Sequence, residues 1–223
     1  YKKEKQLFLK KGGKKMPASR LLNKKLDGGW TVIEMINPKP NATGGNFSVR
    51  YKVLNDNGEE AFLKALDFSH ALQSADVTVA LSEALDEYNF EKGVHELCKE
   101  HKMSRVVIPL DSGSVQTDIP GFHGKVFYII FEKAKGDLRC DESRSNFGDL
   151  EWILRTLHQT AVGIRQLHTK HIAHQDLKPS NVLFFPERGS KISDLGRSSV
   201  KAMPFKWDNV VFPGDANYAP IEK

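Results

Sequence analysis

The sequence contains little cysteine and no long apolar run. Its two cysteines, Cys98 and Cys140, fit neither the paired spacing of a zinc site nor a disulfide framework, so we expect reduced thiols in a cytoplasmic protein. No run of about eighteen apolar residues is present, which predicts no transmembrane helix. The Lys-rich opening also lacks the apolar core of a secretory signal. Because the first residue is Tyr1, we expect the chain to begin within a longer product.

Acidic residues are scarce at the N-terminus. Residues 1–28 hold ten Lys or Arg but only Glu4 and Asp27 as acids, whereas the whole chain has a net charge of +5. Such a basic arm can attract nucleic acid or another acidic partner. The charges are not interleaved with aromatic residues in the way of a single-strand-binding surface. We therefore favour a solvated basic extension at residues 1–29 over a nucleic-acid-binding segment.

The rest of the chain has enough apolar residues for a substantial core. Hydrophobic residues make up 39% of the sequence, which suffices for one large domain or two small ones. Residues 30–36, 49–54 and 61–66 are rich in β-forming side chains and predict three strands. Two more strands are expected at 106–110 and 125–131.

Turn signals separate the first three predicted strands. Residues 37–48 contain two prolines and paired glycines, a composition that excludes a helix there. The sequence Asn-Asp-Asn-Gly at 55–58 predicts a tight hairpin.

Two helices are predicted from apolar periodicity. One begins after an N-cap at Ser74 and ends at His101, with a single stripe formed by Ala84, Tyr88, Glu91, His95 and Cys98. The other, Leu150–His168, is expected to be buried along Ile153, Leu157, Ala161, Ile164 and Leu167. Strands therefore dominate the first half of the chain, and helix dominates the second.

A compact group of charged and amide residues follows the second predicted helix. His-Gln-Asp-Leu-Lys-Pro-Ser-Asn at 174–181 precedes the apolar run Val-Leu-Phe-Phe at 182–185. This pattern predicts a loop that leads into a buried strand. Asp176, Lys178 and Asn181 lie within six residues, so one rigid turn can direct a base, a cation and a metal ligand at one point. Asp194 follows Asp176 by eighteen residues in the sequence Ser-Asp-Leu-Gly.

These two motifs closely resemble those of protein kinases. The loop at 174–181 is similar to H-R-D-L-K-x-x-N, with Gln175 in place of Arg, and the sequence at 194–196 is similar to D-F-G. The resemblance spans about residues 30–222. It implies an α+β, two-lobed protein-kinase-like fold.

The resemblance also implies a division of the chain. Residues 30–132 would form the N-lobe, a five-stranded antiparallel sheet plus a helix. Residues 133–223 would form a mainly helical, partial C-lobe that stops at the end of the activation segment. Complete kinase C-lobes continue with further helices, so we expect a missing segment or a partner to cover apolar surface that they would otherwise bury.

Roles for the loop residues follow from the same resemblance. Asp176 would accept or orient the proton of the substrate hydroxyl, and Lys178 would neutralise the γ-phosphate. Asn181 and Asp194 would hold Mg²⁺, which prefers oxygen ligands. His174 would pack beneath Asp194 as a structural residue.

The resemblance also implies residues that bind the phosphates of ATP. Gly44, Gly45 and Ser48 would form the phosphate-binding loop, although this loop departs from G-x-G-x-x-G because Thr43 and Ser48 stand where the first and third glycines align. Lys64, in the sequence Phe-Leu-Lys-Ala, resembles the lysine of V-A-I-K that pairs with the α- and β-phosphates.

The partner of this lysine is expected on the first predicted helix. Glu91 is the chosen residue, and Glu87 remains an alternative. In the connector between the predicted lobes, Glu132 and Asp137 are expected to contact the nucleotide.

The end of the chain resembles the segment that closes kinase activation loops. In the sequence at 214–222, Asp215 stands where Thr usually bridges the catalytic Asp and Lys, and we expect Asp215 to pair with Lys178 instead. Because Gln175 replaces the Arg that commonly requires an activation-loop phosphate, phosphorylation at Ser198 or Ser199 is not expected to be the main switch.

The sequence thus favours an ATP- and Mg²⁺-dependent serine/threonine protein kinase acting on a protein hydroxyl. The D-L-K-x-x-N form of the loop is typical of Ser/Thr-specific members. Two alternatives stay open: a kinase-fold scaffold, or pseudokinase, that binds nucleotide without efficient transfer, and a small-molecule phosphotransferase. The first usually lacks at least one of the motif residues present here, and the second generally lacks the lysine at position 178.

Overall fold

The computed structural model describes residues 17–37, 48–68, 71–119, 122–140 and 148–219. The chain forms two compact units, each built from two segments. The first unit contains residues 1–80 and 113–128, and the second contains 81–112 and 129–223. No helix in the described ranges is both long enough and apolar enough to cross a membrane.

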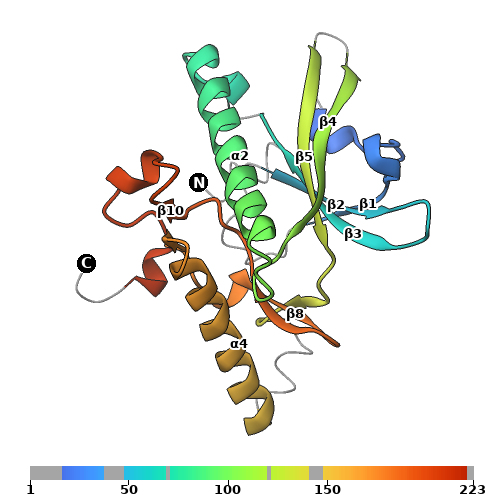
Figure 1. The fold of residues 1–223 in the computed structure, drawn as a ribbon. Coiled ribbons are helices and arrows are strands. Elements are labelled where there is room, and N and C mark those ends of the chain that lie inside the picture. The colour runs from blue at the N-terminus through green and yellow to red at the C-terminus, as the bar shows by residue number, and fades with distance from the viewer. Residues whose placement is uncertain (1–16, 38–47, 69–70, 120–121, 141–147, 220–223) are drawn as a thin grey trace. The chain divides into compact units, whose positions relative to one another are not determined.

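The first unit is built on an antiparallel sheet (Figure 1). Its strands are β1 (Thr31–Ile36), β2 (Ser48–Leu54), β3 (Glu60–Leu66), β4 (Pro109–Ile119) and β5 (Phe122–Glu132). They lie in the order β1-β2-β3-β5-β4, and β4 and β5 continue into the second unit at residues 109–112 and 129–132. The five predicted strands are therefore confirmed, although the fourth begins later than predicted.

The turn between β2 and β3 is fixed by one asparagine. The Oδ1 atom of Asn55 accepts hydrogen bonds from the backbone N–H groups of Asn57 at 3.0 Å and Glu59 at 2.8 Å. Gly58 has φ = 81°, a left-handed conformation that glycine adopts at little cost. The hairpin predicted from Asn-Asp-Asn-Gly is confirmed, and it sets the register that pairs Leu54 with Glu60.

One face of this sheet is buried, and the chain before β1 helps to bury it. Along β2 and β3 the fully buried residues alternate, namely Tyr51, Val53, Ala61, Leu63 and Ala65. The hydroxyl of Tyr51 donates to the carbonyl of Ala18 at 2.7 Å, and burial raises the pKa of Tyr51 to about 12. Leu21 and Leu26 are buried as well. Residues 17–29 are thus part of the folded unit, whereas the sequence predicted a solvated extension there.

The second unit has two long helices and several short elements. Helix α2 is Val77–Glu100, of which residues 81–100 belong to this unit, and helix α4 is Leu150–His168. The short strands are β6 (Gly136–Asp137), β7 (Ile172–Ala173), β8 (Val182–Phe185), β9 (Gly189–Ile192) and β10 (Ser199–Val200). Strands β6, β8 and β9 form one small sheet, and β7 pairs with β10.

Each of the two long helices begins next to an aspartate that caps its N-terminus. The carboxylate of Asp149 accepts from the backbone N–H groups of Glu151 and Trp152, so the second predicted helix is confirmed at both ends. Helix α2 is capped by Asp76, whose Oδ1 atom accepts from the N–H of Val79 at 3.1 Å. The prediction of Ser74 as its N-cap was wrong because Asp76 supplies the acceptor one turn before Val79.

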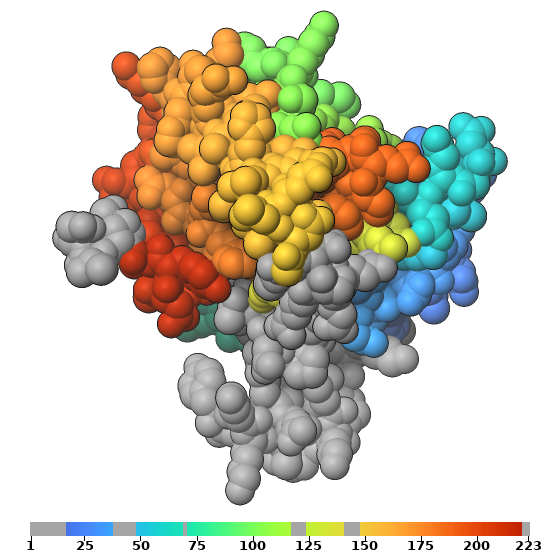
Figure 2. Space-filling view, turned by 90° about the horizontal axis from the view of Figure 1, so that it is seen from below, coloured from blue at the N-terminus to red at the C-terminus, as the bar shows by residue number. Residues whose placement is uncertain are grey.

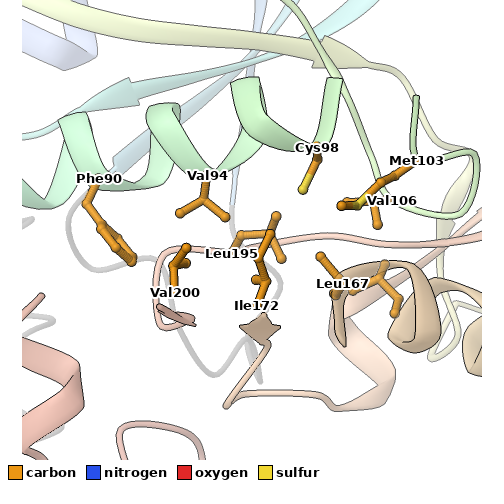
Figure 3. Close-up of a cluster of buried hydrophobic side chains, with 10 residues drawn as sticks. Phe90, Val94, Cys98, Met103, Val106, Leu167, Ile172, Leu195 and Val200 are labelled. Atoms are coloured by element: carbon orange, nitrogen blue, oxygen red, sulfur yellow. The ribbon is translucent and has the colours of Figure 1, made fainter. Parts of the chain in front are cut away.

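The core of the second unit gathers apolar side chains that are far apart in sequence (Figure 3). Helix α2 contributes three residues at four-residue steps, helix α4 contributes Leu167, and loops and short strands contribute the others. The cluster is Phe90, Val94, Cys98, Met103, Val106, Leu167, Ile172, Ile192, Leu195 and Val200. Leu195 is fully buried there, as expected for the residue that stands where kinases usually have Phe.

Two buried side chains of α2 carry polar or ionisable groups. Burial raises the pKa of the Cys98 thiol to about 12, so this cysteine stays a protonated, core-filling residue. His95 is 1% exposed, and its Nδ1 atom donates to the carbonyl of Val107 at 3.1 Å. Its ring also meets Phe131 edge-on, with the ring centroids 4.9 Å apart. A histidine can therefore be buried on this face of α2 because a backbone carbonyl lies opposite it and accepts its N–H.

Residues 106–108 form no strand, contrary to the prediction. Val106 forms only an isolated bridge with Ile192, and the N–H of Val107 donates to the carbonyl of Ile192 at 2.8 Å. Strand β4 begins at Pro109. The apolar run looked like a strand because Val106 and Val107 are both buried, but they are buried against β9 and not within the five-stranded sheet.

Helix α4 is less buried than its sequence predicted. Leu150, Leu154 and Leu157 are 67%, 56% and 61% exposed, and their spacing places them on one side of the helix. Figure 2 shows this part of α4 in yellow and orange at the surface. The expectations that Leu157 and Ala161 are buried were wrong, because both are exposed. This stripe is apolar surface of the kind that the sequence predicted a further segment or partner to cover.

Candidate active site

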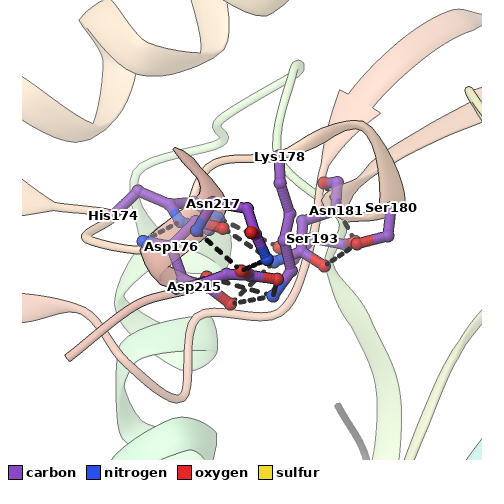
Figure 4. Close-up of polar contacts among 8 residues, drawn as sticks. All are labelled: His174, Asp176, Lys178, Ser180, Asn181, Ser193, Asp215 and Asn217. Carbon is purple, nitrogen blue, oxygen red and sulfur yellow. Dashed lines mark hydrogen bonds and ion pairs between the residues drawn. The ribbon is translucent and has the colours of Figure 1, made fainter. Parts of the chain in front are cut away.

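The loop at 174–181 turns sharply at Gln175. Gln175 has φ = 64°, and the backbone N–H of Asp176 donates to the carbonyl of His174 at 2.9 Å. The left-handed conformation reverses the chain between strand β7 and Asp176. The side chains that follow therefore point back toward one another (Figure 4).

His174 connects this loop to the residue before Asp194. Its Nε2 atom lies 3.0 Å from the carbonyl oxygen of Ser193, and its Nδ1 atom lies 3.2 Å from the backbone nitrogen of Asp176. A neutral imidazole satisfies both contacts if Nε2–H donates and Nδ1 accepts. Burial lowers the pKa of His174, which favours this neutral form. The residue is structural, as the sequence predicted.

The carboxylate of Asp176 receives three donors. The ammonium group of Lys178 lies 2.9 Å from its Oδ2 atom, and Nδ2 of Asn181 donates to Oδ2 at 3.2 Å. The backbone N–H of Asp215 donates to Oδ1 at 2.8 Å. These donors hold the carboxylate of Asp176 in one orientation. The side chains of Asp176 and Lys178 are only 10% and 9% exposed.

Lys178 also faces a second carboxylate. Its Nζ atom lies 3.6 Å from Oδ2 of Asp215, so the predicted pairing of Asp215 with Lys178 is confirmed. The backbone N–H of Asn217, then its side-chain amide, and then the charge of Lys178 lower the pKa of Asp215. Asp215 therefore bridges the two motif residues with different groups, its N–H toward Asp176 and its carboxylate toward Lys178.

A glycine allows this close approach of two segments. A Cβ atom at Gly214 would lie 2.3 Å from the carbonyl oxygen of Gln175 and 3.2 Å from Cα of Asp176. Both are backbone atoms of the catalytic loop, so neither can rotate away. Gly214 is thus required for the hydrogen bond between Asp215 and Asp176, and sequence reasoning assigned it no role.

Asn181 and Asp194 lie at the same end of the β8–β9 hairpin. Val182 pairs with Ile192, and the N–H of Ser193 donates to the carbonyl of Asn181 at 2.8 Å. Asn181 is buried and its Nδ2 atom donates to the carbonyl of Asp176 at 2.8 Å. This bond leaves Oδ1, which accepts from Ser180 at 3.2 Å, as the oxygen that a metal can use. Asp194 has φ = 63° and an exposed side chain.

The donor set suits a metal that arrives with a nucleotide. Within the described ranges, no three His, Cys, Asp or Glu residues are grouped as metal ligands. Asn181 and Asp194 offer one amide oxygen and one carboxylate, both hard ligands of the type that Mg²⁺ prefers. Two protein ligands are too few for a closed metal site, but they match an ion that takes its other ligands from phosphates and water.

The two glutamates considered on helix α2 lie in different surroundings. Glu91 is 9% exposed, and its carboxylate lies beside Gly196, where an added Cβ would be 3.4 Å from Oε2 of Glu91 and 3.9 Å from Oδ1 of Asp194. Glu87 pairs with Lys206 at 2.5 Å. Only Glu91 thus lies against the motif at 194–196, which is the position expected for the residue chosen from the sequence.

In the first unit, Lys64 lies on the partly exposed face of β3, opposite to Leu63 and Ala65. It pairs directly with Arg50 across the strands, so two cations share one face of the sheet. The Oγ atom of Ser48 is buried and has no hydrogen-bond partner among the described residues. Gly44 and Gly45 lie outside the described residues.

Glu132 and Asp137 both hold local ion pairs. Glu132 lies 2.5 Å from Arg188 and 2.5 Å from Lys191, two residues at the β8–β9 hairpin. The carboxylate of Asp137 accepts from Nε and from a terminal nitrogen of Arg139, at 3.1 and 2.9 Å. Their side chains therefore fix the connector after β5, where the nucleotide contacts were expected.

Sequence reasoning missed a second group of residues that pack on α2. Phe205 stacks on Phe90 with ring centroids 4.4 Å apart, and Nε1 of Trp207 donates to the carbonyl of Gly196 at 2.7 Å. The available signal was the pattern Phe-Lys-Trp at 205–207, which places two large aromatic residues close together in the sequence.

Comparison with known proteins agrees with this geometry. The family model described as "Protein kinase domain" matches residues 43–222. Human Myosin-IIIa is 27% identical over 177 residues, which cover 76% of this chain and 10% of that protein. An Aurora kinase from Debaryomyces hansenii is 35% identical over 66 residues, or 30% of this chain and 16% of that protein. Serine/threonine-protein kinase SBK1 from Danio rerio is 39% identical over 54 residues, or 23% and 14%.

The matches thus span only a tenth to about a sixth of these relatives' own length. The family match, in contrast, extends over most of this sequence, from Thr43, just before the paired glycines, to Glu222. It includes every residue described above that contacts Asp176 or Asn181. The chain belongs to the protein kinase domain family.

Proposed function

We propose that this kinase domain is catalytically active and transfers the γ-phosphate of Mg-ATP to a Ser or Thr hydroxyl of a protein substrate. The observation that carries the proposal is the group around Asp176, in which Lys178, Asn181 and the N–H of Asp215 all donate to one carboxylate. Loops of this form, with Lys two residues after Asp, are typical of Ser/Thr-specific members of the family.

The chain's own residues divide the work of the transfer. Asp176 orients the substrate hydroxyl and accepts its proton as the oxygen attacks phosphorus. Its three donors hold the carboxylate in position, so no reorganisation is needed when the substrate arrives. Lys178, already within 2.9 Å of Asp176, is placed to offset negative charge on the transferred phosphoryl group. The nucleotide-bound magnesium supplies charge neutralisation between the phosphates.

Nucleotide binding is assigned to both units separately. In the first, we propose Lys64 with the loop at Gly44, Gly45 and Ser48 as the phosphate contacts. The buried Oγ atom of Ser48, which has no hydrogen-bond partner among the described residues, supports a ligand there. In the second, Asn181 and Asp194 would hold the magnesium ion. Glu132 and Asp137 would contribute through their backbone, because their carboxylates already bind Arg and Lys side chains.

The same proposal extends to the organisation of the chain. We propose residues 30–132 as the N-lobe, residues 133–223 as a partial C-lobe, and the cytoplasm as the location.

A scaffold without transfer activity is less well supported, because Asp176, Lys178, Asn181 and Asp194 are all present and three of them are already hydrogen-bonded together.

Two aspartates test the proposal by separating binding from transfer. Asp176→Asn removes the proton acceptor and should lower kcat by roughly 10²–10⁴-fold, while the affinity for Mg-ATP stays within about twofold of the original because Asp176 does not ligate the metal. Asp194→Asn should weaken nucleotide binding in the presence of Mg²⁺ but not in its absence. The matched control is Asp56→Asn, whose side chain is 70% exposed.

Calorimetry of ATP binding with and without Mg²⁺, beside a transfer assay on a Ser/Thr peptide library, measures both effects. If the unaltered protein bound Mg-ATP but transferred no phosphate, the scaffold alternative would replace the proposed function. If Asp194→Asn bound Mg-ATP normally, the assignment of the metal ligands would be wrong.

A further inference from the structure

Residues 203–208, which follow Gly196 in the chain, pack against helix α2. Phe205 stacks on Phe90 with nearly parallel rings, at an interplanar angle of 9°. An added Cβ at Gly93 would lie 2.7 Å from Cε of Met203, so the helix has a glycine where the methionine side chain rests. We call residues 203–208, with the contacts that they make, the aromatic brace.

Charged residues extend the brace along the same helix. Lys206 pairs with Glu87 at 2.5 Å, and its Nζ atom lies 4.9 Å from the ring centroid of Trp207. The guanidinium group of Arg197 also lies over the ring of Trp207, with its Cζ atom 4.1 Å from the ring centroid. Such cation–π contacts favour an ordered indole ring at a partly exposed site.

The turn itself is held by one carboxylate. Oδ2 of Asp208 accepts from the N–H of Phe205 at 2.9 Å, and Oδ1 accepts from the hydroxyl of Ser199 at 2.5 Å. The hydroxyl of Ser199, and then the N–H of Phe205, lower the pKa of Asp208. The carboxylate of Asp208 therefore ties the brace to strand β10.

The brace and Glu91 meet at Gly196. The indole N–H of Trp207 donates to the carbonyl of Gly196 at 2.7 Å, and the carboxylate of Glu91 lies against the Cα side of the same glycine. Glu87 is one helical turn before Glu91, and Phe90 directly precedes it. The contacts of the brace thus lie in the turn of α2 that carries Glu91.

We propose that the aromatic brace positions Glu91 against the motif at 194–196, and that it does so without phosphorylation of the segment. Phe205 and Trp207 are positioning residues: they touch neither nucleotide nor substrate, but they fix the helix turn and the glycine between which Glu91 lies. This inference rests on the proposed kinase function, because its effect on transfer exists only if the domain is active.

Loosening the brace should lower transfer and leave substrate binding nearly unchanged. Phe205→Ala removes the stacked ring, and Trp207→Phe keeps an aromatic ring but removes the N–H donor to Gly196. We expect each to lower kcat by about tenfold, equal to about 1.4 kcal/mol, with KM for the protein substrate changed by less than about twofold. Val211→Ala, at a side chain that is 81% exposed, is the matched control and should change neither constant.

A charge exchange tests the brace without removing an aromatic core residue. Lys206→Glu should lower kcat by about threefold because it faces Glu87, and adding Glu87→Lys should restore at least half of the loss. Amide hydrogen exchange of residues 87–95, followed without substrate, reports the helix directly. It should speed up in Phe205→Ala and in Lys206→Glu, and return toward the original rate in the double variant.

The two readouts separate failure of the brace from failure of the kinase function. Unchanged exchange at 87–95 in Phe205→Ala, or unchanged or increased kcat in an active protein, would overturn the brace as a positioning device. An unaltered protein without transfer activity refutes the proposed function, but the exchange experiment still decides whether the brace holds the helix. Thermal unfolding of each variant identifies any loss that comes from global destabilisation.

Discussion

Replacing Gly214 by alanine should impair catalysis by separating two backbone segments. The new Cβ would lie 2.3 Å from the carbonyl oxygen of Gln175 and 3.1 Å from the ring of Phe212. A carbon and an oxygen in ordinary contact are about 3.3 Å apart, so the segments must move apart by about 1 Å. The N–H of Asp215 now lies 2.8 Å from Oδ1 of Asp176. After this movement the distance exceeds the range of a hydrogen bond.

The size of the effect follows from the bond that is lost. A hydrogen bond to a charged group contributes about 1.5–3 kcal/mol, and about 1.4 kcal/mol corresponds to a factor of ten in rate. If that bond orients Asp176 during transfer, kcat should fall by roughly 10- to 100-fold. Mg-ATP affinity should change by less than about twofold, because the three atoms nearest to the added Cβ belong to Gln175, Asp176 and Phe212 and not to Asn181 or Asp194.

Two further variants identify the cause of the loss. Gly148→Ala is the matched control, since a Cβ there meets nothing within 4 Å. Asp215→Ala keeps the backbone N–H that donates to Asp176 but removes the carboxylate near Lys178, so its kcat should fall less than that of Gly214→Ala. Steady-state kinetics on purified, folded proteins give all three values. A fully active Gly214→Ala enzyme would refute the proposed importance of this approach.

Three other predictions follow from single sites. Lys64→Met should abolish detectable transfer and leave the fold intact, while Lys25→Met at the surface changes neither; kinase assays with circular dichroism check this, and retained activity would remove Lys64 from the site. Changing Ser198 and Ser199 together to Ala should leave basal activity within about tenfold, or 1.4 kcal/mol, as a phosphate-independent segment requires; a larger loss would show that phosphorylation matters. Burial lowers the pKa of His174 below 6.5, so the unfolded state binds the proton more readily than the folded state. The free energy of unfolding should therefore keep its full value above about pH 6.5 and fall at lower pH. A denaturation series from about pH 7.5 to about pH 5 that shows the same pH dependence in a His174→Gln variant would contradict this.

The catalytic group was predictable because its residues are close in sequence. Asp176, Lys178 and Asn181 are separated by at most five positions, and a loop of that length places them together whatever the rest of the chain does. The Asp215–Lys178 pair could also be predicted, since the family pattern aligns position 215 with a residue known to bridge the same two side chains. The short loop was sufficient to predict the first group, and the family pattern was sufficient to predict the second pair.

The sequence was less informative where burial depends on distant segments. The stripe of helix α2 holds both Glu91 and His95. The fold shows that His95 meets the carbonyl of Val107 and that Glu91 lies beside Gly196, two contacts that periodicity does not reveal. Likewise Val106 has the composition of a strand, but it packs against Ile192, which is 86 positions later in the chain. Periodicity identifies a buried face but does not name the segment that covers it.

The departures from the family pattern are connected through the charges of the activation segment. With Gln175 in place of Arg, the loop has no cation at that position for a phosphate to neutralise. Nearby cations in the segment already have internal partners, since Arg197 lies on Trp207 and Lys206 pairs with Glu87. A phosphate on Ser199 would meet the carboxylate of Asp208, which now accepts from its hydroxyl, and two anions at that distance repel each other. The substitution at 175 and the brace therefore favour the same conclusion: this segment is ordered by its own side chains, and phosphorylation at Ser199 would disorder it.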